Sequence, residues 1–150
     1  MSAQTQATFV DWMLSVKGVN IKAAYTEYMS SLRVDIDPYD IMHCVSVSTC
    51  VSVQLMKSKL RKREVVNARY IAMHFVKHYC PSLTLVKIGY YFGGRDHSSV
   101  IHGLQTFEDM IDTSDADFMR MYHSAAALVQ QLFERKAATT KIAAEHEFIR

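Results

Sequence analysis

Two adjacent glycines, Gly93 and Gly94, separate two stretches whose apolar residues recur at the three- and four-residue spacing of helices. Glycine adopts positive φ at little cost, so the pair predicts a tight turn between a helix over residues 85–92 and a second helix that Asp96 can cap. The second helix begins with polar residues. A short helix, a glycine turn and a polar helix start form the layout of a helix-turn-helix, which favours a fold of packed helices around it.

The rest of the 150-residue chain carries the same helical spacing, and only five glycines and two prolines interrupt it. Residues 44–53 alternate like a strand, but a lone strand has no partner, so we expect helix, a short break near 48–50 and a further helical turn. We therefore predict an all-α fold, a helical bundle that contains a helix-turn-helix. The other expected helices cover residues 5–17, 20–33, a segment starting at Pro38 behind the cap Asp37, 64–79, and 115–135 before a polar tail at 136–150.

Positive charge is concentrated in one part of the sequence. Residues 57–77 hold seven basic side chains against one acid, Glu64, whereas residues 108–117 hold five acids and no base. This asymmetry predicts a positive face that can meet an acidic partner, although a solvated charged loop explains it equally well. The seven basic residues are Lys57, Lys59, Arg61, Lys62, Arg63, Arg69 and Lys77.

The start of the helix behind the glycine turn carries groups suited to DNA. Asp96 can accept a hydrogen bond from a cytosine amino group. The three residues that follow, His97, Ser98 and Ser99, can bond base edges or phosphates, and a helix N-terminus itself attracts phosphate. The simpler interpretation is that Asp96 only caps the helix and that His97 is only a surface residue.

Two segments stand in an order and at a spacing typical of one family: KLRKREVVNARYIAM over residues 59–73 and IGYYFGGRDHSSVIH over residues 88–102. Together they resemble the C-terminal DNA-binding domain of the bacterial replication initiator DnaA. The resemblance implies a DNA-binding domain over residues 35–113, followed by a C-terminal helix and polar tail at 114–150. Residues 1–34 then form a two-helix extension, which we expect to pack on the domain or to make a homodimer.

The resemblance also implies a role for each matching residue. Arg61 matches the arginine that enters the minor groove. Asp96, His97 and Ser98 match the residues that read the major groove, although threonine is frequent in place of Ser98. Gly103 stands where the family prefers alanine. The family's usual DNA site, close to TTATNCACA, is the expected starting target. The positions that match or adjoin phosphate contacts are Lys59, Arg63, Arg69, Lys77, Arg95 and Ser99.

Several absences narrow the expected function. The sequence contains no Gly-x-x-x-x-Gly-Lys-Ser/Thr phosphate loop, so we expect no nucleotide, no cofactor and no enzymatic activity. His74 and His78 have a zinc-compatible spacing but lack the glutamate of His-Glu-x-x-His, so we expect two exposed polar residues and no metal site. No run approaches the roughly 18 apolar residues of a membrane span.

The three cysteines, Cys44, Cys50 and Cys80, show no paired spacing, so we expect buried reduced thiols in a cytoplasmic, nucleoid-associated protein. The favoured hypothesis is a non-enzymatic, sequence-specific binder of double-stranded DNA. It would act as a regulator, a replication factor or a phage or mobile-element protein. The alternative is a protein-interaction module that keeps the fold and docks an acidic partner on its basic face.

Overall fold

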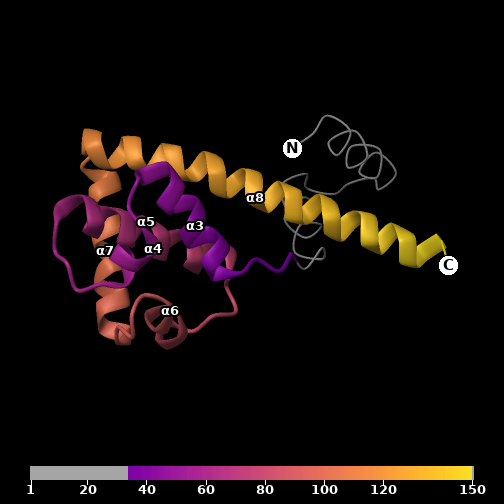
Figure 1. The fold of residues 1–150 in the computed structure, drawn as a ribbon, viewed down its shortest axis with the longest axis horizontal. Coiled ribbons are helices and arrows are strands. Elements are labelled where there is room, and N and C mark those ends of the chain that lie inside the picture. The colour runs from indigo at the N-terminus through magenta and orange to yellow at the C-terminus, as the bar shows by residue number, and fades with distance from the viewer. Residues whose placement is uncertain (1–33, 150) are drawn as a thin grey trace, which may run out of the picture. The chain divides into compact units, whose positions relative to one another are not determined.

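The structure is a computed structural model that describes residues 34–149 of the chain (Figure 1). One compact unit consists of Ile36–Leu132, and residues 133–149 belong to a second unit. The helices predicted at 5–17 and 20–33, the two-helix extension and a homodimer through it all lie outside the described residues.

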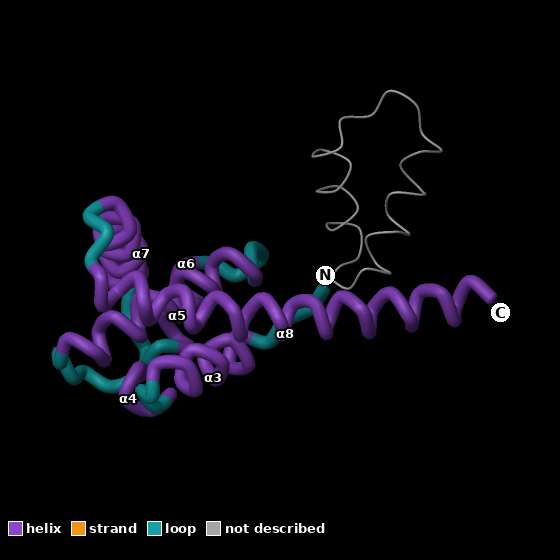
Figure 2. Tube along the Cα trace, turned by 90° about the horizontal axis from the view of Figure 1, so that it is seen from above, coloured by secondary structure: helices purple, strands orange, loops and turns teal. Residues whose placement is uncertain are grey.

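The described residues form six helices and no strand, which confirms the predicted all-α class (Figure 2). A short turn joins the helix over Leu85–Tyr91 to the helix over His97–Asp112, as in a helix-turn-helix. The helices are α3 (Pro38–Thr49), α4 (Val53–Lys57), α5 (Arg63–Tyr79), α6 (Leu85–Tyr91), α7 (His97–Asp112) and α8 (Ala116–Ile149).

The ends of α3 follow from its local sequence. Asp37 Oδ1 accepts a hydrogen bond from the backbone N–H of Tyr39 at 2.8 Å, and Pro38 is the first helical residue, as predicted. Cys50 adopts the left-handed conformation, with φ of 59°, and so ends the helix. The strand-like alternation at 44–53 therefore forms a helix with a break, and its buried side chains, Val45 and Val51, pack in a core made of helices instead of against a neighbouring strand.

The central helix of the Ile36–Leu132 unit is α5, which contacts α3, α4, α6 and α7 (Figure 1). Its fully buried side chains include Ile71 and Val76, and each such burial stabilises the fold by roughly 1.5–3 kcal/mol. Helix α7 approaches α5 closely at Gly103. A Cβ atom there would lie 2.9 Å from Cδ1 of Tyr70 and 3.0 Å from Sδ of Met73. A Cβ atom at Gly103 would press on both side chains, so the close approach of the two helices fits the glycine at this position.

An aromatic cluster joins α5, α7 and α8 around His74. The His74 ring stacks on Phe107 with centroids 3.9 Å apart, and Phe75 stacks on Tyr122 at 5.6 Å. The prediction that His74 is exposed is therefore wrong, whereas His78 is exposed. Burial, and then the neighbouring His78, lower the pKa of His74 to about 4, so the ring is neutral and acts as a packing residue.

The last helix is longer than the sequence suggested. A polar tail was expected from residue 136 onward, but α8 continues through Ile149. The reason is that residues 136–149 contain no glycine or proline and include four alanines, the best helix former. The hydroxyls of Thr139 and Thr140 donate to the carbonyls four residues earlier, at 3.0 and 2.9 Å, so these side chains do not interrupt the helix.

The three cysteines form no disulfide, but only one of them is buried as predicted. Cys80 is buried, and its thiol donates to the carbonyl of Ile36 at 3.2 Å. Cys44 is half-buried and Cys50 is exposed, because Cys50 occupies the left-handed position that ends α3. The prediction of three buried thiols is thus wrong for these two residues.

Candidate nucleic-acid interface

The turn between α6 and α7 has the backbone geometry that its glycines predict. Gly93 and Gly94 have φ of 87° and 75°, in the region that side chains disfavour. The backbone N–H of Arg95 then donates to the carbonyl of Gly89 at 2.9 Å, which folds the turn back onto α6. Because a Cβ atom at Gly89 would collide with the carbonyl oxygen of Arg95, the two helices can approach this closely only with glycine there.

The start of α7 presents polar side chains to solvent. Asp96 Oδ1 accepts from the backbone N–H of Ser99 at 2.8 Å, so Asp96 is the N-cap, as predicted. The backbone and then the side-chain hydrogen bonds from Ser99 lower the pKa of the Asp96 carboxyl, which keeps it ionised. Asp96, His97 and Ser98 are exposed and Ser99 is half-buried.

The loop of residues 58–62, which we call the basic loop, links α4 to α5. Lys59, Arg61 and Lys62 are all exposed on it, as a contact to an anionic partner requires. The loop has no regular secondary structure. Within the loop, the N–H of Leu60 donates to Oγ of Ser58 at 3.3 Å.

Arg69 holds the basic loop from inside the protein. Its Nε donates to the carbonyl of Met56 at 2.7 Å, and its Nη2 donates to the carbonyls of Ser58 and Leu60 at 2.9 and 3.0 Å. The residue is only 4% exposed. Burial and the charge of Arg95 lower the pKa of the guanidinium, although such a group stays protonated. This placement disagrees with the predicted phosphate contact, because Arg69 is buried and its Nε and Nη2 already donate to backbone carbonyls.

Arg95 connects the basic loop to the helix-turn-helix. Its Nη2 donates to the carbonyl of Ser58 at 2.6 Å, and Ser58 is the first residue of the loop. Gly93 packs directly on the backbone at Lys57, because a Cβ atom at Gly93 would collide with the carbonyl of Lys57. The structure thus brings the basic loop and the start of α7 together, although 34 residues separate Arg61 from Arg95 in the sequence.

Comparison with known proteins identifies this pair of elements. Residues 38–106 match the family model described as the bacterial DnaA protein helix-turn-helix. Residues 38–106 belong to the DnaA helix-turn-helix family. The resemblance predicted from the sequence is thereby confirmed.

Several relatives of the DnaA-type domain carry the name chromosomal replication initiator protein DnaA. The protein of Flavobacterium psychrophilum is 31% identical over 99 residues, which are 66% of this chain and 20% of that protein. The protein of Laribacter hongkongensis is 34% identical over 112 residues, 75% of this chain and 22% of that protein. The protein of Chlorobaculum tepidum is 45% identical over 62 residues. The chain spans about a fifth of the length of the first two of these relatives.

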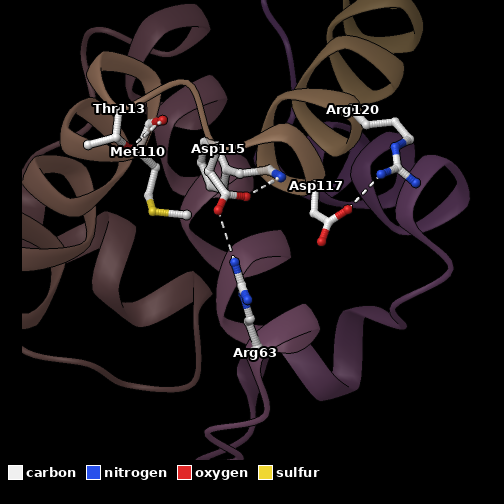
Figure 3. Close-up of polar contacts among 7 residues, drawn as sticks. Arg63, Met110, Thr113, Asp115, Asp117 and Arg120 are labelled. Atoms are coloured by element: carbon white, nitrogen blue, oxygen red, sulfur yellow. Dashed lines mark hydrogen bonds and ion pairs between the residues drawn. The ribbon is translucent and has the colours of Figure 1, made fainter.

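Arg63, at the first position of α5 in the DnaA-type domain, forms an ion pair. Its Nη2 lies 3.0 Å from Oδ2 of Asp115, which precedes α8 (Figure 3). Asp115 also caps α8, because its Oδ1 accepts from the backbone N–H of Phe118 at 3.0 Å. The Arg63 side chain is 66% exposed, so it is within reach of an external anion, which would compete with Asp115.

Lys77 is exposed but lies apart from the other predicted contacts. It follows Arg63 by 14 residues on the same helix, a rise of roughly 21 Å. The structure therefore does not bring Lys77 to the basic loop. Lys77 lies instead near the C-terminal end of α5, three residues before Cys80 and the segment that leads into α6.

Two features of the DnaA-type domain were not found by sequence reasoning. Gly89 lies within α6, and its role in the helix–helix approach was missed; an isolated glycine in so short a helix is the signal that indicates it. The carbonyl of Ser58, which accepts from Arg69 and Arg95, has no sequence signal at all. Within the described part of the chain, no cluster of His, Cys, Asp and Glu could hold a metal ion. No helix described there is long and apolar enough to span a membrane.

Proposed function

We propose that this chain binds double-stranded DNA sequence-specifically, as a non-enzymatic regulator related to replication or transcription. In this proposal α7 enters the major groove and the basic loop enters the adjacent minor groove. The observation that supports it is the junction at Ser58, which ties the loop that carries the exposed Arg61 to Arg95, the residue directly before the exposed start of α7. Two exposed recognition elements fixed to each other suit two neighbouring grooves of one duplex.

The proposed base contacts come from both elements. Arg61 reads the narrow minor groove of an A·T-rich step, where the negative potential attracts arginine. Asp96, His97 and Ser98 read the major groove from the first turn of α7, where their side chains are exposed. The remaining exposed or half-buried predicted residues would contact phosphates: Lys59, Arg63, Lys77, Arg95 and Ser99.

The relatives support a role connected with replication. Their printed name is chromosomal replication initiator protein, and this chain matches about a fifth of the length of the first of them. We carry over only DNA binding at a replication-related site, with TTATNCACA as the starting sequence. In this role the chain would contribute the two elements that read DNA, which are α7 and the basic loop.

The test is a selection of bound duplexes from a random pool, followed by affinity measurements over a range of salt concentrations. We expect one preferred sequence and a logarithmic affinity that falls linearly with the logarithm of the salt concentration. If no duplex binds at low salt, or if binding ignores sequence, the proposal fails, and an acidic protein partner for the basic face becomes the better hypothesis.

Two variants then separate base contacts from phosphate contacts. Arg61→Ala should relax the preference at one A·T-rich position and weaken binding by about 1–3 kcal/mol. Lys77→Ala should weaken all duplexes alike and lower the salt slope by about 1. An unchanged profile for Arg61→Ala removes Arg61 from the site, and a loss confined to one sequence for Lys77→Ala contradicts a phosphate role.

A further inference from the structure

Two arginines from different elements meet at one backbone oxygen in the DnaA-type domain. The carbonyl of Ser58 accepts from Nη2 of Arg69 at 2.9 Å and from Nη2 of Arg95 at 2.6 Å. A carbonyl oxygen has two lone pairs, so both hydrogen bonds can form at once. Arg69 belongs to α5 and Arg95 to the turn before α7. The oxygen is therefore the point at which the basic loop, α5 and the helix-turn-helix are joined.

Arg69 fixes the path of the basic loop. Its guanidinium bonds the carbonyl of Met56, in the last turn of α4, and the carbonyls of Ser58 and Leu60 in the loop. Carbonyls in the last turn of a helix and in an irregular loop have no partner within a helix, and the bonds from Arg69 supply one. A single rigid fork thus holds three points along five residues. Since Arg61 directly follows Leu60, the position of its backbone depends on this fork.

Arg95 fixes the other side of the junction. Its side chain binds Ser58, while its backbone N–H donates to the carbonyl of Gly89. The Nε atom of Arg95 is buried although the residue as a whole is half-buried, so one edge of the guanidinium lies inside this junction. The residues that follow Arg95 are those proposed to read the major groove. Movement of the basic loop is therefore coupled to the start of α7.

We propose that Arg69 and Arg95 are positioning residues that set one fixed spacing between the minor-groove and major-groove contacts. This inference rests on the proposed DNA binding, and it adds that the two contacts are not independent. The recognised DNA would then be a site whose two parts keep one separation. A single inserted base pair moves those parts apart by roughly 3.4 Å and turns them by roughly 35° about the duplex axis, which a rigid junction cannot follow.

The first experiment measures the register directly. The probe is the duplex obtained by selection, with and without one base pair inserted between the position that Arg61→Ala relaxes and the position that His97→Ala relaxes. We expect the insertion to weaken binding by the wild-type protein at least tenfold, because one of the two base contacts is lost. In Arg95→Ala the same insertion should cost less than threefold.

The ratio of affinities for the two duplexes is the decisive measurement, because a general folding defect lowers both affinities alike. The matched control is Arg120→Ala, since Arg120 is an exposed arginine that pairs with Asp117 on its own helix. This control should keep the wild-type ratio. An Arg95→Ala protein that also keeps the wild-type ratio overturns the inference, whereas failure of the wild-type protein to select any sequence overturns the proposed function instead.

A second experiment asks whether Arg69 acts through the loop or touches DNA. Arg69→Gln removes the charge, and as a positioning residue it should lose the preference at the Arg61 position while keeping the salt slope of the wild type. A fall of the slope by about 1 would show a phosphate contact and contradict the inference. Helicity and the thermal midpoint are measured on the same sample. If Arg69→Gln does not fold, the insertion ratio of Arg95→Ala decides alone.

Discussion

The basic loop and the turn between α6 and α7 are both short irregular segments, but different kinds of contact stabilise them. The turn is held mainly by its own residues: positive φ at two glycines, the N-cap Asp96 and the hydrogen bond from Arg95 to Gly89. The basic loop is held mainly from outside, by Arg69 of α5 and by Arg95. Residues close in sequence thus hold the turn, whereas the arginines that hold the basic loop bond residues 9 to 37 positions away in the sequence.

This difference separates two kinds of mutational sensitivity. A change within the turn alters local backbone geometry and the stability of the helix that follows it. A change in the exposed residues of the basic loop should alter the proposed DNA contacts and leave the fold intact, because the exposed side chains of the loop do not hold it in place.

The largest effect is expected from Gly89→Ala. The new Cβ atom would collide with the carbonyl of Arg95, so the backbone of the turn must move. We expect a loss of about 3 kcal/mol in the free energy of unfolding, measured by urea denaturation, together with loss of DNA binding. Gly94→Ala is the matched control at the other extreme, because a Cβ atom there meets nothing and only the positive φ is strained. Equal costs for the two variants would show that the close approach does not limit stability.

Acid should destabilise the protein through His74, which belongs to neither the basic loop nor the turn between α6 and α7. The pKa of His74 is about 4 in the folded protein and about 6.5 in the unfolded chain, so between these values the unfolded chain binds more protons. Stability therefore falls as the pH is lowered from 6.5 to 4. The partial exposure of the ring limits the loss to about 1–2 kcal/mol.

The measurement is the difference between the wild type and His74→Phe, which keeps the stacking on Phe107 but does not titrate. Subtraction removes the contribution of carboxylates that titrate in the same range. His78→Gln serves as the control for the exposed neighbour that also lowers the pKa of His74. A His74→Phe protein with the same pH dependence as the wild type would contradict the assignment to His74.

Loss of the cap at Asp96 should lower the free energy of unfolding by less than the changes above, but it should also impair DNA binding. Asp96→Ala removes the acceptor for the backbone N–H of Ser99, a cost of about 1 kcal/mol. Asp37→Ala removes an equivalent cap at the start of α3. We expect similar falls in thermal midpoint for the two variants and a loss of sequence preference only for Asp96→Ala. Equal losses of preference would mean that Asp96 acts only through stability.

The smallest effect is expected where the basic loop meets α5. Asp115→Asn keeps a side-chain acceptor for the N-cap of α8 but removes the charge that pairs with Arg63. Because an exposed ion pair is worth about 0–1 kcal/mol, we expect DNA affinity to rise by at most a few fold, with a slightly steeper salt slope. Asp117→Asn, which releases Arg120 from a similar pair, is the control and should change neither quantity (Figure 3).

The helices and their caps could be predicted from sequence because the signals are local. Asp37 and Asp96 each precede an apolar repeat, and each accepts the expected backbone hydrogen bond. Helix α8 is longer than predicted because its polar residues at 136–149 include no helix breaker, so the polar composition alone does not end the helix. His74 was misjudged because the apolar stripe on α5 gives no sign that Phe107 lies beside it.

Arg69 shows why the candidate site could be predicted only in part. In the sequence it is one of seven basic residues between positions 57 and 77, with nothing to separate it from Arg61 or Lys77. In the structure it is buried, whereas those two are exposed. Charge pattern records which side chains are positive, but it does not record which of them point inward at carbonyls distant in sequence. That distinction requires the packed positions of α4 and α5.

The junction at Ser58 uses backbone carbonyls as its acceptors, and this choice affects how the protein responds to its ionic surroundings. Salt weakens the attraction between exposed lysines or arginines and phosphates, so the fraction of DNA sites occupied falls as ions are added. Hydrogen bonds to neutral carbonyls that are buried or partly buried are screened far less. The ionic strength of the medium would therefore govern occupancy, while the distance between the two reading elements stays the same from dilute buffer to concentrated salt.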